Sequence, residues 1–260
     1  MGIEVELEDQ NQGQNQGQNQ GQDQGQDQGQ NQEQDQGQNQ EQDQGQGVGL
    51  GHQIKGSGVS GKEIAVMRFV HEFGFCEINQ IIKRFEIKKS MAYDIVKVSV
   101  LRGLIERVTV IDGRRKAHVV TRKGLQLLDL DLPLVRKISL VTYEHHLAVI
   151  DVAITLKKSY PEAVFISERR LRRDQFGIGY GKNCHMPDGL LLFPDNQKYA
   201  IEVEKTLKLR ERLETILIGY GLQNQVSEVW YFCASDVFPT VNEISNNMPY
   251  VKTYDLKAFS

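Results

Sequence analysis

Hydrophobic residues recur at helical spacing in three segments that follow residue 60. The first helix is expected over 62–73, with an apolar face formed by Ile64, Met67, Phe69, Val70 and Phe73. The second is expected over 77–85. The third is expected over 89–102, and its spacing predicts four inward side chains: Met91, Ile95, Val98 and Leu101. Gly74 and Gly103 stand just past the first and third segments, where glycine commonly ends a helix.

The pattern changes to one typical of strands after the third helix. Two β-rich runs, 105–111 and 117–121, flank a turn that contains Asp112 and Gly113, a pair that favours a hairpin. A short helix over 122–128 is expected to close this unit. Residues 61–130 therefore form the first predicted domain.

A second mixed segment follows a short connector at 132–134. Its predicted order is helix, strand, strand, strand, helix, strand, followed by one more helix and one more strand. The ranges are 138–158, 164–168, 186–193, 198–205, 206–221, 228–233, 239–246 and 251–256. The arginine-rich residues 169–173 either continue the strand before them or form a basic rim. The class is a mixed α/β (α+β) fold, with a second domain over 138–260.

The first 60 residues differ in kind from the rest. From Asp9 to Gln46 every even position is Gln, and no apolar residue occurs in this tract, so nothing offsets the entropy lost by ordering it. We expect a disordered Gln-rich tail over 1–60.

Charge is also divided along the chain. The net charge of -3 combines -9 over residues 1–60 with +6 over 61–130, where 14 basic residues face 8 acidic ones. The remaining residues are neutral overall. Positive charge in one small segment favours a polyanionic partner there.

Three helices followed by a hairpin with a basic tip resemble a winged helix-turn-helix domain. The resemblance implies that the third helix enters the major groove of double-stranded DNA and that the hairpin lies along the backbone or in the minor groove. The DNA-binding residues it implies are Lys88, Lys89, Ser90, Tyr93 and Lys97 on the helix, and Arg114, Arg115 and Lys116 on the hairpin.

Acidic residues stand at both ends of a second predicted hairpin. Asp188 enters its first strand, and Glu202 and Glu204 lie near the end of its second. Three such carboxylates can hold a hard cation such as Mg²⁺. A two-residue loop at 195–196 would place Asp188 opposite Val203. We instead predict a loop one residue longer or shorter, or a bulge, which puts Asp188 beside Glu202 or Glu204.

Residues 140–235 resemble the PD-(D/E)XK nuclease superfamily in motif and in element order (αβββαβ, a restriction-endonuclease-like core). The resemblance implies that Asp188, Glu202 and Glu204 are catalytic and bind metal, with Glu168 and Glu144 as extra candidate ligands. A lysine usually stands where this chain has Glu204, so the motif is degenerate.

A narrower resemblance covers most of 61–235. It rests on the winged-helix start, the segments 144–151 and 167–171, Pro187-Asp188-Gly189 and 201–204, which together are similar to the replication-relaxation family of plasmids and integrative elements. It implies a DNA-binding accessory protein whose nuclease-like domain is active or inactive, with a homodimer or other replication and mobilisation proteins as partners. A Mg²⁺-dependent endonuclease or nickase and a winged-helix transcription regulator are the alternatives.

The cysteines and histidines add little to this prediction. Cys76, Cys184 and Cys233 are too few and scattered for a disulfide framework. The pairs Cys184-His185 and His145-His146 lack metal-ligand spacing, so packing or surface roles are expected. No apolar run is long enough to cross a bilayer, and no signal-like start is present, so a cytoplasmic protein without a membrane partner is predicted.

Overall fold

The computed structural model describes residues 4–6, 58–111, 115–178, 185–222 and 226–259. Within these residues the fold is mixed α/β, with eight α-helices, a three-stranded antiparallel sheet and a five-stranded mixed sheet. The predicted class is confirmed. In the described part, no helix has the length and apolarity needed to span a membrane.

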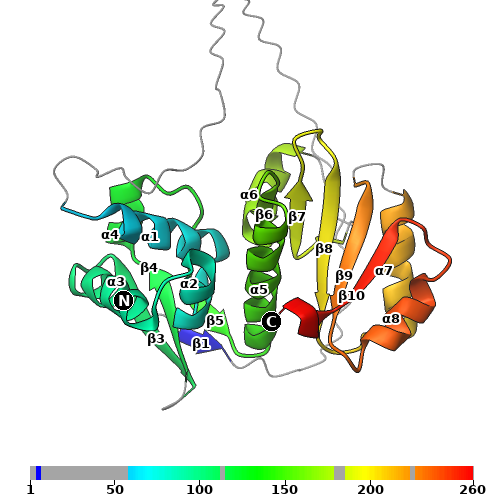
Figure 1. Ribbon diagram of the computed structural model, residues 1–260, viewed down its shortest axis with the longest axis horizontal. Helices are drawn as coiled ribbons and strands as arrows, with labels where there is room; N and C mark the ends of the chain where they lie inside the picture. Colours follow the sequence, from blue (N-terminus) through cyan, green and yellow to red (C-terminus); the bar gives the residue numbers. More distant parts are fainter. Residues whose placement is uncertain (1–3, 7–57, 112–114, 179–184, 223–225, 260) are drawn as a thin grey trace, which may run out of the picture.

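The N-terminal unit interleaves helices with a small sheet (Figure 1). Its elements are α1 (Gly61–Phe73), β2 (Phe75–Cys76), α2 (Ile78–Phe85), α3 (Lys89–Leu101), β3 (Ile105–Ile111), β4 (Arg115–Val120) and α4 (Arg122–Leu128). The strand order is β2-β4-β3, and both pairings are antiparallel. The short strand β2 was not predicted, because two residues carry no periodic pattern.

The predicted start of this unit agrees with a capping box. The Ser60 hydroxyl accepts from the Glu63 amide, and the Glu63 carboxylate accepts from the Ser60 amide at 3.0 Å, so two otherwise unpaired donors of α1 are satisfied. Val59 is buried beside it. The predicted disorder over 1–60 is therefore wrong for these two residues. It is also wrong for β1 (Glu4–Glu6), which pairs in parallel with β5 (Lys137–Ser139).

The predicted inward face of α3 is wrong for three of its four residues, and the fourth, Ile95, packs against the core. Met91, Val98 and Leu101 are exposed, Leu101 by 77%, whereas the buried side chains are Ala92, Val96 and Ser99. Small residues face inward because the helix packs closely against α1 and β3. The predicted outward residues, Lys89, Tyr93 and Lys97, are exposed as expected.

The C-terminal unit is built on one sheet of order β10-β9-β8-β7-β6. Its strands are β6 (Val164–Ser167), β7 (Gly189–Leu192), β8 (Lys198–Glu204), β9 (Glu228–Cys233) and β10 (Val251–Asp255). The first three form an antiparallel meander, and β9 and β10 continue it in parallel. The helices are α5 (Tyr143–Ser159), α6 (Glu168–Ile178), α7 (Arg210–Leu222) and α8 (Phe238–Ser245), and a 3-10 turn, Leu256–Phe259, follows β10.

Two predicted boundaries in this unit need correction. The helix expected over 138–158 begins only at Tyr143, because 137–139 form β5. Residues 169–173 do not continue the strand; they lie in α6. Arg172 Nε donates to Glu168 one turn earlier at 2.9 Å, and the neighbouring arginines reach groups on the N-terminal unit. These contacts favour a helix over an extended strand.

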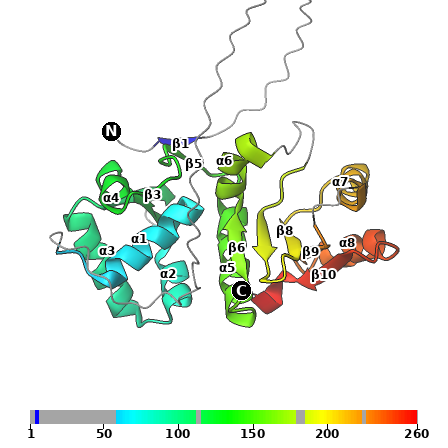
Figure 2. The same ribbon diagram turned by 90° about the horizontal axis from the view of Figure 1, so that it is seen from above.

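Helix α5 stands between the two units in both views (Figures 1 and 2). One side of it, which includes Tyr143, Leu147 and Ile150, belongs to the core of the N-terminal unit. Its other side, Val149, Val152 and Leu156, packs into the core under the sheet. The second predicted domain therefore contributes its first helix to both cores.

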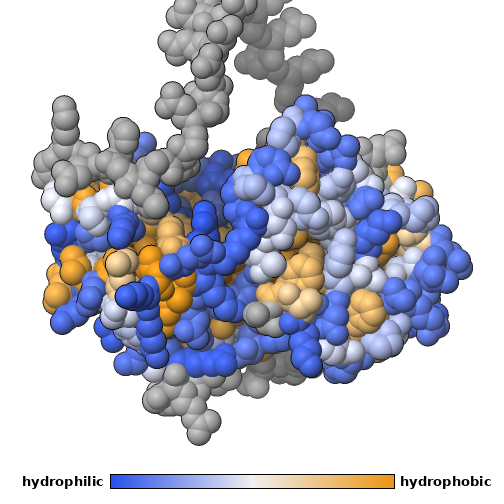
Figure 3. Space-filling view, viewed as in Figure 1, coloured by the Kyte–Doolittle hydropathy of each residue, from blue (hydrophilic) through white to orange (hydrophobic). Residues whose placement is uncertain are grey.

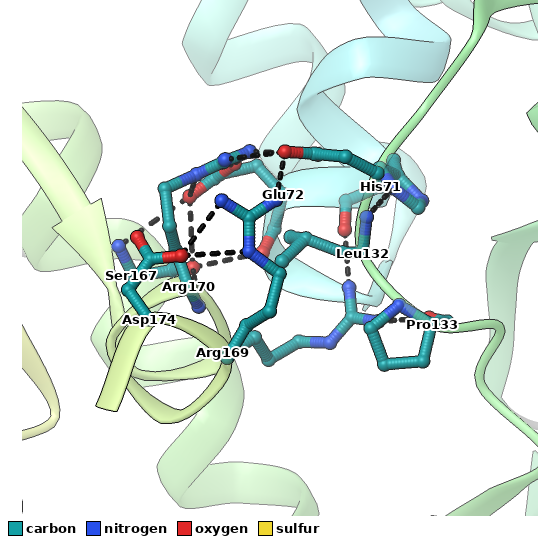
Figure 4. A network of polar contacts seen from close by, with 10 residues as sticks. His71, Glu72, Leu132, Pro133, Ser167, Arg169, Arg170 and Asp174 are labelled. Atoms are coloured by element: carbon teal, nitrogen blue, oxygen red, sulfur yellow. Dashed lines mark hydrogen bonds and ion pairs between the residues drawn. The ribbon is translucent and has the colours of Figure 1, made fainter. Parts of the chain in front are cut away.

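Charged side chains seal the same junction (Figure 4). Arg170 pairs with Glu72 of α1 at 2.7 Å and with Asp131 at 3.0 Å. Ser167 Oγ donates to Glu72 at 2.8 Å, and Arg169 donates to the carbonyl oxygens of His71 and Pro133. Hydrogen-bonded arginines with several acceptors hold a fixed geometry, so these contacts tie α6 to α1.

We predict that Ile150→Ala lowers the free energy of unfolding by about 3 kcal/mol, since Ile150 is fully buried in α5 and truncation leaves a cavity. Urea denaturation measures the change. Leu222→Ala is the control, because Leu222 is 80% exposed and its truncation should change stability by less than about 0.5 kcal/mol. Equal losses in the two variants would contradict this account of α5.

His118 of β4 gives the protein a pH-dependent stability. Its Nδ1–H donates to the carbonyl of Cys76, and burial lowers its pKa from 6.5 to about 4. His118 therefore stays neutral in the folded state at pH values at which it is protonated in the unfolded state. The stabilisation that neutral His118 contributes is present above pH 6.5 and is lost as the pH falls towards 4. Between pH 7.5 and pH 5, we expect the free energy of unfolding of His118→Gln to fall by about 2 kcal/mol less than that of the parent. Urea unfolding at both pH values measures this difference. Identical losses would refute the assignment.

Candidate acidic site at the ends of β7 and β8

The β7–β8 hairpin brings Asp188 and Glu202 together. Gly189 pairs with Ile201 and Leu192 pairs with Lys198, so the same register places Asp188 opposite Glu202. The turn spans one residue more than the two-residue loop, with the Phe193 amide donating to Gln197 at 3.0 Å. Of the predicted alternatives, the structure has the loop that is one residue longer and places Asp188 beside Glu202. Because side chains alternate along a strand, Glu204 lies on the same face of β8 as Glu202.

Each carboxylate in this group has a protein donor. Asp188 accepts from the Val203 amide at 2.8 Å and contacts His145 Nε2 at 2.9 Å. Glu202 is 2% exposed, contacts His185 Nε2 at 2.8 Å and accepts from the Tyr220 hydroxyl. Glu204 is also buried and pairs with Lys208. Each buried carboxylate thus has a hydrogen-bonding partner, which offsets the cost of removing its charge from water.

The histidines respond to their acidic partners. Burial disfavours the imidazolium of His145, but the hydrogen bond and charge of Asp188 outweigh it and raise its pKa. His185 behaves in the same way: burial opposes the charged form, and Glu202 raises the pKa. Burial raises the pKa of Glu202, the charge of Asp188 raises it further, and the contacts with His185 and Tyr220 oppose the rise. The carboxylates lie close enough to affect one another.

A tyrosine beside this group has no partner for its hydroxyl. Tyr231 of β9 is fully buried, and its register partner on β8 is Glu202. Its Oη makes no hydrogen bond to any part of the chain that the structure describes. Burial raises the pKa of this tyrosine, and the charges of Glu202, Glu204 and Asp188 raise it further. Among the described residues, this hydroxyl is the buried side-chain polar atom that is left without a hydrogen bond.

The arrangement does not supply a ready-made magnesium centre. The oxygen donors are of the kind that Mg²⁺ prefers. However, histidine, tyrosine and lysine contacts already engage them, and the described residues contain no group of three or more His, Cys, Asp or Glu side chains placed to hold a metal ion. Metal binding by Asp188, Glu202 and Glu204 stays a prediction.

Of the two extra candidate ligands, Glu168 adjoins the acidic site. Its amide donates to the Asp188 carbonyl at 3.3 Å, and both residues line a cavity of about 40 Å³ with His145. Glu144 is half exposed and pairs with Arg115 and with Lys205, and Glu168 pairs with Arg172. Of the three histidines expected to be surface or packing residues, only one has a packing role. His146 does pack, stacked on Phe75 at 4.0 Å, whereas His145 and His185 contact the acidic site. Each of these two contacts joins separate elements, so spacing along the chain carried no signal for it.

The predicted DNA-binding residues occupy two environments. Lys88, Lys89 and Ser90 are exposed at the start of α3, and Tyr93, Lys97 and Lys116 are exposed as well. Arg115 instead faces the junction, paired with Glu144 and within 3.8 Å of Glu77. Arg114 lies outside the described residues.

Comparison with known proteins adds no relative. No protein-family model matches this sequence, and no curated protein is significantly similar to it.

Two tyrosines of the acidic site should respond oppositely to loss of the hydroxyl. Tyr231→Phe removes an unsatisfied buried group, so we expect the free energy of unfolding to rise by about 1 kcal/mol. Tyr220→Phe removes a donor to buried Glu202 and should lower it by about 1–3 kcal/mol. Chemical denaturation of both variants checks this. Destabilisation by Tyr231→Phe as large as that by Tyr220→Phe would mean that its hydroxyl has a partner.

Proposed function

We propose that this chain is a double-stranded DNA-binding accessory protein, acting in replication or relaxation of a plasmid or mobile element. Its N-terminal unit would be a winged helix-turn-helix, and its C-terminal unit a nuclease-like domain used for contact rather than cleavage. The observation that carries DNA binding is the unneutralised positive charge of α3. The mobile-element role rests on the resemblance of the sequence motifs.

The lysines at the start of α3, within α3 and on β4 are not neutralised by ion pairs in the described part of the chain. Lys88, Lys89, Lys97 and Lys116 are exposed and form no ion pair among the described residues. Elsewhere many cations are matched, as in Arg102–Glu63, Lys158–Glu86 and Arg210–Glu214. Unmatched cations at one end of a molecule attract a polyanion, and phosphate neutralisation supplies most of non-specific DNA affinity.

The element order supports a winged-helix interpretation. Strand β2 lies between α1 and α2 in sequence and pairs with β4 of the β3–β4 hairpin. A three-residue turn joins α2 to α3, and Glu86 in that turn adopts a left-handed conformation with φ 52°. In helix-turn-helix proteins the second helix of such a pair contacts base edges with its N-terminal residues. Here those residues are Lys88, Lys89 and Ser90.

The C-terminal unit supports a nuclease-like architecture without favouring cleavage. Its order is α5, β6, β7, β8, α7, β9, with α6 inserted after β6. Asp188 and Glu202 occupy opposite positions on β7 and β8, as the resemblance implies. Glu204 stands at the usual lysine position and is held by Lys208. With the carboxylates engaged by protein donors, no observation favours hydrolysis.

We expect the full chain to bind a fluorescent duplex in an anisotropy titration, with an affinity that falls steeply as salt rises. Lys88→Ala/Lys89→Ala should weaken binding about tenfold and lower the salt slope by about two, because two phosphate contacts are lost. Lys198→Ala/Lys252→Ala removes the same charge from exposed positions of the sheet unit and is the matched control.

Equal weakening by both double variants would show that net charge, rather than α3, determines binding. Supercoiled plasmid incubated with Mg²⁺ tests the alternative. Cleavage by the parent and not by Asp188→Ala would replace the accessory role with an endonuclease. Absence of duplex binding at low salt would refute the proposal.

A further inference from the structure

An apolar groove lies where α1 and α2 meet α5 and β6. It is formed by two adjoining cavities of about 440 and 290 Å³ that share Arg84, Phe85, Ile154 and Lys157. Its floor is mainly aromatic, contributed by Phe69, Phe73, Phe85 and Phe165. Hydrophobic residues gather on this half of the molecule, bordered by hydrophilic ones (Figure 3). We call this feature the aromatic groove.

The aromatic rings form a connected set. Phe69 contacts Phe73 at 5.3 Å and Phe85 at 5.9 Å between ring centroids, and Phe73 contacts Phe165 at 5.9 Å. Phe69, Phe85 and Phe165 are only partly buried. Rings from three elements, α1, α2 and β6, thus meet at a concave surface that the protein itself does not fill.

The rim of the aromatic groove is cationic. Its acidic neighbours are already matched, since Glu72 pairs with Arg170 at 2.7 Å and Glu86 with Lys158 at 2.8 Å. Arg68 and Arg84 are exposed, and neither forms an ion pair within the described part of the chain. Lys157 donates to the carbonyls of Pro161 and Ala163 and to no carboxylate. The occupant that complements this rim carries negative charge.

We propose that the aromatic groove binds unpaired nucleotides of a DNA strand that leaves the duplex held by α3. Aromatic side chains stack on bases of any sequence, and neighbouring cations neutralise the phosphates, which is how single-stranded DNA is commonly bound. A paired duplex hides its base faces from aromatic side chains, so only an unpaired segment can stack on these rings. The cavity size lies within the roughly 300–1,000 Å³ typical of ligand sites.

The position of the groove agrees with this occupant. Arg84 lies in the last turn of α2, and Lys88 is the N-cap of α3, so both stand at the same helix-helix turn. A strand held at the start of α3 therefore passes the rim of the groove. The inference rests on the proposed DNA binding for its geometry and extends it from duplex DNA to junctions between duplex and single strand.

Anisotropy titrations with one duplex, blunt or extended by a short oligothymidine overhang at either end, test this. We expect one overhang to tighten binding about tenfold, because stacked bases add affinity. Phe85→Leu, which keeps an apolar side chain without a ring, and Arg68→Gln should each abolish most of that advantage and leave affinity for the blunt duplex unchanged. Arg212→Gln, at an exposed position on α7, is the control and should keep the advantage.

Thermal unfolding establishes that each variant is folded, and Arg68→Gln tests the groove even if Phe85→Leu is unstable. The proposal is overturned if overhangs bind no tighter than the blunt duplex, or if both variants keep the advantage. It is also overturned if a synthetic acidic peptide with one phenylalanine binds the parent but not Phe85→Leu while overhangs have no effect, since the groove would then serve a protein partner. Overhang binding without blunt-duplex binding would leave this inference standing and refute the proposed duplex function.

Discussion

Burial of α5 on two sides is the constraint on which the rest of the structure depends. Ile150 and Ala153 lie in the core of the N-terminal unit, and Val149 and Val152 lie in the core under the sheet. A helix with two apolar faces must bury both of them against other elements. The two units are therefore held at one geometry, and both the acidic site and the aromatic groove are built against this helix.

The junction also explains how the protein tolerates so much charge in its interior. Glu72 meets Arg170, Ser167 meets Glu72, and Asp151 meets Gln80 and Lys83 across the boundary. At the ends of β7 and β8 the carboxylates are matched by histidine, tyrosine and lysine side chains instead. Removing one partner of a buried ion pair lowers stability by more than the pair contributes, because the remaining charge is buried without a partner or water. The acidic site is consequently stable as a protein structure in its own right.

Part of the positive charge that the junction does not use lies on the N-terminal unit. Several cations near α5 and α6 form ion pairs at the junction between the two units. Among them is Arg115, which the sequence pattern assigns to a DNA-binding hairpin tip. The lysines at the start of α3 and the arginines at the rim of the aromatic groove have no such partners among the described residues. One member of each group, Arg84 and Lys88, stands beside the α2–α3 turn.

The sequence alone determined the order of most elements and the mixed α/β class, because these depend on the local spacing of apolar residues. It left the register of the β7–β8 hairpin open between alternatives, and the pairing of Gly189 with Ile201 decided between them. It did not determine which face of α3 is buried, since Met91 and Val98 have the right spacing but only Ala92, Val96 and Ser99 allow close packing. Nor could it reveal that 169–173 are helical, because Arg170 finds Glu72 at a separation of 98 residues. The contacts of His145 with Asp188 and of His185 with Glu202, like the aromatic groove, arise only when distant segments meet around α5. Only the tertiary structure decided these features, because each depends on partners that no local pattern specifies.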